Sequence, residues 1–161
     1  MGMAAQVGDK APDFRLPATG ERDTIALGEF QGKKNVVLLF FPFAFSPVCT
    51  DEFCAVRDTH YAEFDQLDAQ VLGISVDSPF TLKAWAEQQG FRFPLLSDFN
   101  KEVAQAYDVY YEQLGNFRGV AKRAAFVIDK DGIIRYRWVS DDPKVLPDLG
   151  EIRKVLAELQ G

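Results

Sequence analysis

Two cysteines stand five positions apart in the run Pro42-Phe43-Ala44-Phe45-Ser46-Pro47-Val48-Cys49-Thr50-Asp51-Glu52-Phe53-Cys54. Ser46 followed by Pro47 is typical of a helix start, with serine as the N-cap and proline in the first helical position. Cys49 would then lie in the first helical turn, where backbone N–H groups lack partners and the helix dipole is positive. That environment favours a thiolate, which makes Cys49 a candidate nucleophile or redox centre. A half-buried, inert cysteine is the alternative.

The elements that must position this junction follow from the apolar patterns. The continuous run 36–41 is too short for a helix and predicts a strand buried on both faces. Apolar residues then recur at mostly helical spacing over 47–67, which predicts a long amphipathic helix. The remaining patterns predict a hairpin within 12–27, a strand at 71–76, a helix at 79–89, a short strand at 93–96, a helix at 101–107, a hairpin of 124–128 with 133–139, and a helix at 147–159.

The alternation of strands and helices, closed by a hairpin and a helix, indicates the fold class. Crossover helices make neighbouring strands parallel, and the hairpin adds an antiparallel pair. The sequence therefore predicts an α/β domain with a mixed sheet and helices on both faces. No repeat or linker divides residues 1–161, so we expect one domain. A chain of this length can bury a core without a disulfide or a metal.

Charge and composition exclude several classes of protein. Eighteen Lys and Arg against 24 Asp and Glu give a net charge of -6, which argues against binding nucleic acid. The longest apolar run is far shorter than the roughly 20 residues that span a bilayer, so we expect no membrane segment. Residues 1–9 lack the pattern of a signal peptide or a myristoylation site, so we expect a cytoplasmic protein. One histidine and two cysteines make a poor zinc set, and no metal or cofactor is expected.

The pattern Pro42-x-x-x-Ser46-x-x-Cys49 resembles the active-site signature of the peroxiredoxins. The resemblance covers nearly the whole chain. Three further segments share it, namely Val7-Gly8-Asp9-Lys10-Ala11-Pro12-Asp13-Phe14, Phe93-Pro94-Leu95-Leu96-Ser97-Asp98 and Arg123-Ala124-Ala125-Phe126-Val127-Ile128-Asp129. It implies a thioredoxin-like fold.

The resemblance implies a role for each matching residue, and the chemistry of each is consistent with it. Cys49 would attack a peroxide oxygen as a thiolate and become a sulfenic acid. Arg123 would hold Cys49 ionised and donate to the peroxide oxygens as negative charge develops on the leaving oxygen. The Ser46 hydroxyl can both accept and donate, although capping the helix is its alternative role. Pro42 would shield the sulfur from water, or would simply end the strand.

Two other polar residues lie on the long predicted helix. Glu52 follows Cys49 by one turn and, by the resemblance, would pair with the active-site arginine. A solvated acid in the first helical turn is the alternative. His60 is predicted on the apolar face, about 16 Å along a continuous helix from Cys49. Because a base must reach its nucleophile, this distance counts against a Cys-His hydrolase.

Cys54 has two interpretations. Its spacing from Cys49 resembles the peroxiredoxin Q (bacterioferritin comigratory protein) branch, in which the second cysteine resolves the sulfenic acid within one chain. Other segments look more like the one-cysteine alkyl hydroperoxide reductase E type, in which an outside thiol resolves. On an ideal helix the two Cα atoms lie about 8–9 Å apart and face different directions. A disulfide tolerates roughly 7 Å, so the helix would have to unwind first.

The resemblance implies a thiol peroxidase that reduces hydrogen peroxide and organic hydroperoxides and is recycled by thioredoxin or a similar thiol reductant. A general disulfide oxidoreductase is an alternative, but that activity usually relies on a Cys-x-x-Cys pair, which this chain lacks. A non-catalytic redox-regulated binding protein is another. The sequence is compatible with a monomer or a homodimer.

Overall fold

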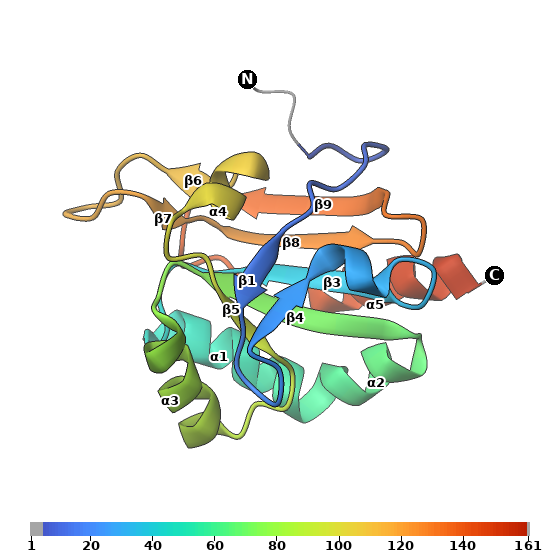
Figure 1. Cartoon of the computed structure of the whole chain (residues 1–161), viewed down its shortest axis with the longest axis horizontal. Helices are drawn as coiled ribbons and strands as arrows, with labels where there is room; N and C mark the ends of the chain where they lie inside the picture. Colours follow the sequence, from blue (N-terminus) through green and yellow to red (C-terminus); the bar gives the residue numbers. More distant parts are fainter. Residues whose placement is uncertain (1–4, 161) are drawn as a thin grey trace.

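A five-stranded mixed sheet with the strand order β5-β4-β3-β8-β9 forms the centre of the computed structural model, which describes residues 5–160 (Figure 1). Residues 1–4, the start of the N-terminal segment considered above, and residue 161 lie outside the described residues. β3 is parallel to β4, and β4 is parallel to β5, while β8 is antiparallel to both β3 and β9. The strands are β3 (Asn35–Phe40), β4 (Ala69–Ser75), β5 (Leu95–Ser97), β8 (Arg123–Ile128) and β9 (Ile134–Ser140).

The central strand β3 positions the candidate site. All six of its residues are buried, as the apolar run predicted. Its antiparallel partner β8 pairs Ala124 with Phe40, so the start of β8 lies beside the end of β3. Arg123, which immediately precedes Ala124, is thereby brought to the same edge of the sheet as the loop that follows β3.

Helices cover the two faces unequally. One face is covered by α1, α2, α3 and α5, and the other by α4 and a two-stranded hairpin, β1 with β2. A second small hairpin, β6 with β7, extends from one end of the molecule (Figure 1). The elements are α1 (Pro47–Ala55), α2 (Tyr61–Gln66), α3 (Pro79–Gln89), α4 (Glu102–Ala106), α5 (Leu149–Gln160), β1 (Arg15–Pro17), β2 (Thr24–Ala26), β6 (Tyr110–Tyr111), β7 (Val120–Ala121) and a 3₁₀ turn η1 (Leu27–Phe30).

The long helix predicted over 47–67 is interrupted by a π-helical segment, η2 (Val56–His60), between α1 and α2. The Tyr61 N–H donates to the Val56 carbonyl, five residues back. Widened turns of this kind are rare and often lie at functional sites. The apolar spacing of the sequence carries no signal for this widening, so the prediction of a regular helix was wrong at these five residues.

Two of the other boundaries that differ from the predictions have a clear physical cause, and one hairpin was missed. β5 begins at Leu95 rather than at 93, because Pro94 has no N–H to donate to the strand ladder. The helix α5 begins after Asp148, whose carboxylate accepts from the Gly150 N–H at 2.9 Å and caps the first turn. The hairpin of β6 and β7 was not predicted, because its strands are only two residues long.

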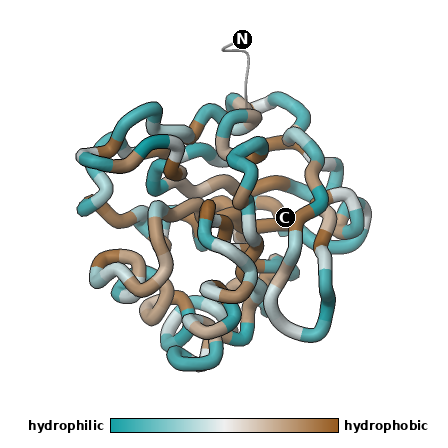
Figure 2. The backbone as a smooth tube through the Cα atoms, turned by 60° about the vertical axis from the view of Figure 1, so that its left-hand side comes forward, coloured by the Kyte–Doolittle hydropathy of each residue, from teal (hydrophilic) through white to brown (hydrophobic). Residues whose placement is uncertain are grey.

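Two apolar layers lie on either side of the sheet, and hydrophobic segments occupy the interior while hydrophilic ones form much of the outer loops (Figure 2). Trp85 belongs to the layer under α1 and α3, and Tyr107 belongs to the opposite layer. Both are fully buried, as expected for core aromatics. Within residues 5–160, no helix is both long and apolar enough to span a membrane.

Candidate active site

The loop that joins β3 to α1 sets the position of Cys49. Ser46 is the N-cap of α1, and its hydroxyl oxygen accepts from the Cys49 N–H at 3.3 Å. Pro47 occupies the first helical position, as the sequence predicted. The Asp77 carboxylate, from the loop after β4, accepts from the Ala44 N–H at 2.7 Å and fixes the loop to the neighbouring strand end.

Cys49 therefore lies in the first turn of α1, where the helix dipole favours negative charge. The residue is completely buried. Its Sγ atom lies 3.0 Å from Nη2 of Arg123, and this contact is also buried. The thiol thus meets the dipole of α1 and the guanidinium of β8 at the same point.

The Arg123 guanidinium is oriented by contacts on three sides. Nη2 faces Cys49, Nη1 donates to Oε1 of Glu52 at 2.6 Å, and Nε donates to the Pro143 carbonyl at 2.9 Å. Only 1% of the arginine is exposed. Its pKa is raised above the ordinary value because the charges of Cys49 and Glu52 outweigh the opposing effect of burial. The guanidinium is therefore a fixed, permanent positive charge beside the sulfur.

Glu52 is buried against Arg123, so the alternative of a solvated first-turn acid was wrong. Burial raises the pKa of Glu52 to about 7, although the charge and hydrogen bond of Arg123 oppose the shift. The second carboxyl oxygen, Oε2, is buried and has no hydrogen-bond partner among the described residues. Glu52 therefore titrates close to neutral pH while it holds the arginine.

Cys54 does not join this cluster. It is half-buried, and its thiol donates to Oε1 of Gln89, the last residue of α3, at 3.5 Å. Cys49 and Cys54 belong to one uninterrupted α-helical segment, and both are free thiols. Two Cα atoms five residues apart on a helix are about 8–9 Å from each other, beyond the roughly 7 Å that a disulfide allows.

The structure also places Pro42 and His60, the remaining residues considered from the sequence. Pro42 is buried at the start of the loop after β3. His60 is only partly buried, stacks on Phe64 and contacts Glu63 at 3.2 Å. His60 was predicted on the apolar face of the helix, and the structure agrees only in part, because its one apolar ring contact is with Phe64 among the described residues. Among residues 5–160, no group of three or more His, Cys, Asp or Glu side chains is arranged to hold a metal.

Two contributors to the site were missed by sequence reasoning. The Pro143 carbonyl lies 20 residues after Arg123, in a loop with no motif to single it out. Asp77 follows a parallel strand at its carboxyl end, where ligands and functional groups commonly gather, and that position was a usable signal.

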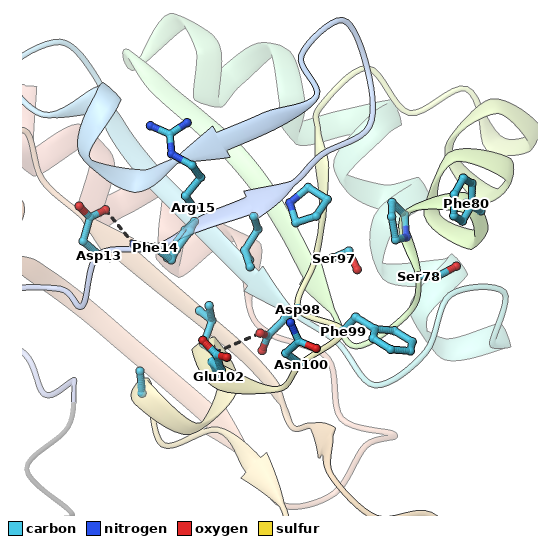
Figure 3. Close-up of a pocket in the computed structure, with 15 residues that line it drawn as sticks. Asp13, Phe14, Arg15, Ser78, Phe80, Ser97, Asp98, Phe99, Asn100 and Glu102 are labelled. Atoms are coloured by element: carbon cyan, nitrogen blue, oxygen red, sulfur yellow. Dashed lines mark hydrogen bonds between the residues drawn. The ribbon is translucent and has the colours of Figure 1, made fainter.

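A separate hollow of about 650 Å³ lies between β1, the start of α3 and α4 (Figure 3). Ser97 and Asp98 reach it from the end of β5, and the exposed rings of Phe80 and Phe99 stand at its rim. Cys49 and Arg123 are not among its lining residues. This hollow is therefore separate from the buried pair of thiol and guanidinium.

Comparisons with known proteins place the chain in one family. Residues 7–137 match the model of the AhpC/TSA family. The chain is 47% identical over 132 residues to alkyl hydroperoxide reductase E of Mycobacterium tuberculosis, covering 81% of this chain and 82% of that protein. It is 40% identical over 148 residues to the chloroplastic 2-cysteine peroxiredoxin of Chattonella marina var. antiqua, covering 86% and 73%.

Among solved structures, a cysteine-to-serine mutant of Xylella fastidiosa PrxQ superposes with a TM-score of 0.82 at 26% identity, covering 99% of this chain and 98% of that one. This match confirms the prediction of a thioredoxin-like mixed sheet. With a family model spanning most of its length and peroxiredoxins as its relatives, the chain is a peroxiredoxin of the AhpC/TSA family.

Proposed function

We propose that Cys49 reduces hydrogen peroxide and small organic hydroperoxides. The thiolate sulfur attacks one peroxide oxygen, an S–O bond forms and the O–O bond breaks. The leaving oxygen takes up a proton and departs as water or as an alcohol, and Cys49 becomes a sulfenic acid. The complete burial of Cys49 favours small peroxides over bulky electrophiles.

Each neighbour of Cys49 supports one part of this step. Arg123 stabilises the thiolate before attack and the negative charge on the leaving oxygen during it. Glu52 holds the guanidinium in that orientation. The Ser46 hydroxyl accepts from the Cys49 N–H and keeps its own hydrogen free to donate to the sulfur or the peroxide. Pro42 contributes a buried wall without an N–H group.

The observation that carries the proposal is the 3.0 Å contact between Arg123 Nη2 and Cys49 Sγ in a buried site. Single-turnover mixing of the reduced protein with hydrogen peroxide tests it. A second-order reaction that yields one sulfenic acid at Cys49 supports the proposal. Reaction no faster than that of a free thiol in water overturns it.

We further propose that Cys54 resolves the sulfenic acid. Its sulfur attacks Sγ of Cys49, the S–S bond forms, the S–O bond breaks, and the oxygen leaves as water with a proton. A thioredoxin-like dithiol then reduces the disulfide by exchange. Because the helical spacing is too long for a disulfide, part of α1 must unwind, and oxidation should lower the helical signal in circular dichroism. A disulfide formed with an unchanged spectrum would contradict this step.

One observation favours a one-cysteine cycle with an outside thiol instead, namely the spacing of Cys49 and Cys54 on α1, which is too long for a disulfide while the helix is intact. The mass of the intact protein after one equivalent of peroxide separates the two cycles. Loss of two hydrogens within one chain identifies Cys54 as the resolving residue. Gain of one oxygen, trapped at Cys49 by a sulfenic-acid reagent, assigns resolution to an outside thiol.

We also propose that this cycle operates in the cytoplasm. The proposed cycle ends with exchange against a dithiol, and a reducing compartment supplies such a reductant. Cell fractionation with an antibody against the native chain tests the location.

A further inference from the structure

The two halves of α1 are held in place by different contacts. Ahead of Phe53, polar contacts of Arg123 with Cys49 and Glu52 connect the helix to the sheet. From Phe53 onward, the contacts are to Phe41 after the end of β3, to α3 and to the segment that leads to β5. A peroxide that oxidises Cys49 changes the first set of contacts chemically and leaves the second set untouched.

Phe53 is the first of the later anchors. It is fully buried between the two cysteines, and its ring lies 4.6 Å from that of Phe41 and 5.4 Å from that of Trp85, centroid to centroid. The rings of Phe91 and Phe93 lie at 6.0 and 5.7 Å. Moving Phe53 would expose a large ring and open the aromatic core, which makes this residue a fixed point of the helix.

Two further anchors are Gln89, the last residue of α3, and Arg57 of η2, which contacts Gln89. The Gln89 side chain accepts from the Cys54 thiol, and its backbone carbonyl accepts from Nη1 of Arg57. Arg57 also makes a bidentate ion pair with Asp58, at 2.7 and 3.1 Å. The last carbonyls of a helix have no intrahelical donor and lie at the negative end of its dipole, so a guanidinium is well matched to this position.

This cluster lies at the junction of α1 and the π-helical segment η2, because Arg57 is the second residue of η2 and Cys54 precedes it by three. The amide of Gln89 offers two functions to Cys54. Its oxygen accepts from the thiol in the present structure, and its NH₂ group can donate to the thiolate once the proton has left. The same side chain therefore fits both protonation states of the sulfur.

We propose that Gln89 and Arg57 are positioning residues that keep Cys54 stationary, so that α1 unwinds only ahead of Phe53 and Cys49 moves to Cys54. The inference rests on the proposed resolving role of Cys54. Residues 46–52 form the moving part, and residues 53–66 stay docked. Because Cys54 is held still, the sulfenic acid of Cys49 meets its thiol at a higher effective concentration, which speeds disulfide formation.

Hydrogen exchange on the wild-type protein, reduced and after one equivalent of peroxide, tests where the helix opens. We expect peptides covering 46–52 to exchange about tenfold faster after oxidation. Peptides covering 56–66 and 86–93 should keep their rates. Faster exchange over 56–66 or 86–93 to the same degree overturns the inference, even if the disulfide forms and the resolving role of Cys54 stands.

Substitution of the anchor gives a second, independent test. In Arg57→Met and in Gln89→Leu, disulfide formation should slow about tenfold relative to the peroxide step, and more Cys49 should reach the sulfinic acid at a fixed peroxide excess. Arg57→Lys, which keeps one donor for the Gln89 carbonyl, should recover part of the rate. Unchanged partition between disulfide and sulfinic acid in both variants overturns the inference.

Arg153→Met is the matched control. Arg153 makes a similar exposed ion pair with Glu63 of α2, at 2.8 Å, but contacts neither cysteine. In this variant the partition of Cys49 between disulfide and sulfinic acid should therefore equal that of the wild type. If the wild-type protein gains one oxygen and forms no disulfide, the resolving role of Cys54 fails and the inference fails with it. If the disulfide forms but the helix also opens beyond residue 53, the inference fails while the resolving role of Cys54 stands.

Discussion

Arg123 and Cys49 are 74 residues apart in the chain, yet Nη2 of the arginine lies 3.0 Å from the sulfur in a buried contact. The antiparallel pairing of β8 with β3 brings them together, since it places the first residues of one strand beside the last residues of the other. The contact thus depends on sheet register, and a shift of one residue would turn the guanidinium to the opposite face.

Replacing this arginine should remove most of the peroxide reactivity. In Arg123→Met, we expect the rate of Cys49 with hydrogen peroxide to fall by about 100-fold or more, since a buried charge-stabilising donor is lost. Arg123→Lys should fall less, because it keeps the charge without the planar fork. Stopped-flow single turnovers measure both. Arg137→Met, an arginine substitution on the adjacent strand β9, is the control, and an equal loss there would show a general effect of the substitution.

Glu52 should make the stability of the fold depend on pH near neutrality. Burial raises its pKa from 4.5 to about 7, so between these values the folded state holds a proton that the unfolded state has lost. The free energy of unfolding should therefore fall as pH rises through this window, by on the order of 1 kcal/mol per pH unit from this residue.

Urea unfolding at several pH values between 4.5 and 7 measures this slope. Glu52→Gln, which is neutral throughout, should flatten it. Glu29→Gln is the control variant, because Arg22 and the Ala26 N–H lower the pKa of Glu29, so its contribution changes mainly below pH 4.5 and the slope between 4.5 and 7 should match that of the wild type. A slope that survives in Glu52→Gln would assign the pH dependence to another group.

Ser46 should contribute both a helix cap and a catalytic hydroxyl. Ser46→Ala should cost about 1 kcal/mol of stability through the lost cap and should also slow the peroxide step. Ser78 is a matched control, since it caps α3 with the same geometry, accepting from the Thr81 N–H at 3.2 Å with proline next in sequence. Ser78→Ala should lose similar stability and keep its peroxide rate. Equal rates in the two variants would reduce Ser46 to a cap.

Gly73 should set how closely α1 approaches the sheet. A Cβ atom on Gly73 would lie 2.5 Å from Cε2 of Phe53 and 2.8 Å from Cδ2 of Leu95. Gly73→Ala should therefore destabilise the fold by about 1–3 kcal/mol and displace Phe53, and with it Cys49 relative to Arg123. The thermal midpoint and the single-turnover rate should both fall.

Two comparisons check the role of Gly73. Adding Phe53→Leu to Gly73→Ala should recover part of the stability, because the shorter side chain leaves room for the methyl group. Gly28→Ala places its Cβ 3.3 Å from Oδ2 of Asp13, a longer contact than either at Gly73, and should cost less stability than Gly73→Ala. A Gly73→Ala protein with wild-type stability would show that Phe53 can shift freely.

Much of the fold was predictable because its signals are local. The buried run of β3, the Ser-Pro start of α1 and the Gly90 end of α3 each depend on a few neighbouring residues. The π segment η2 was not predictable, since its hydrogen bonds depend on packing rather than on apolar spacing. The short strands β6 and β7 were missed for the related reason that two residues make no pattern.

The residues of the site also differ in whether a local sequence signal marks them. Cys49 and Ser46 follow from helix-start chemistry, whereas Arg123 was found only through a family resemblance, because nothing local marks one arginine among many. The burial of Glu52 could not be read from its position near the start of a helix, where acidic side chains usually face solvent, and the structure places it in the second turn of α1. The Pro143 carbonyl that orients Arg123 lies beyond any sequence signal, because every residue offers a carbonyl.

Phe45, just ahead of the Ser46 cap, has a φ of 68°, in the left-handed region that a bulky side chain disfavours by roughly 1–2 kcal/mol. The reduced fold holds this residue in place through the loop around it and the nearby ring of Trp85. When the first turns of α1 unwind in the proposed cycle, Phe45 is free to return to an extended backbone. The reduced enzyme thus holds backbone strain at Phe45. In the proposed cycle, oxidation of Cys49 releases this strain, and reduction of the disulfide by the dithiol must restore it.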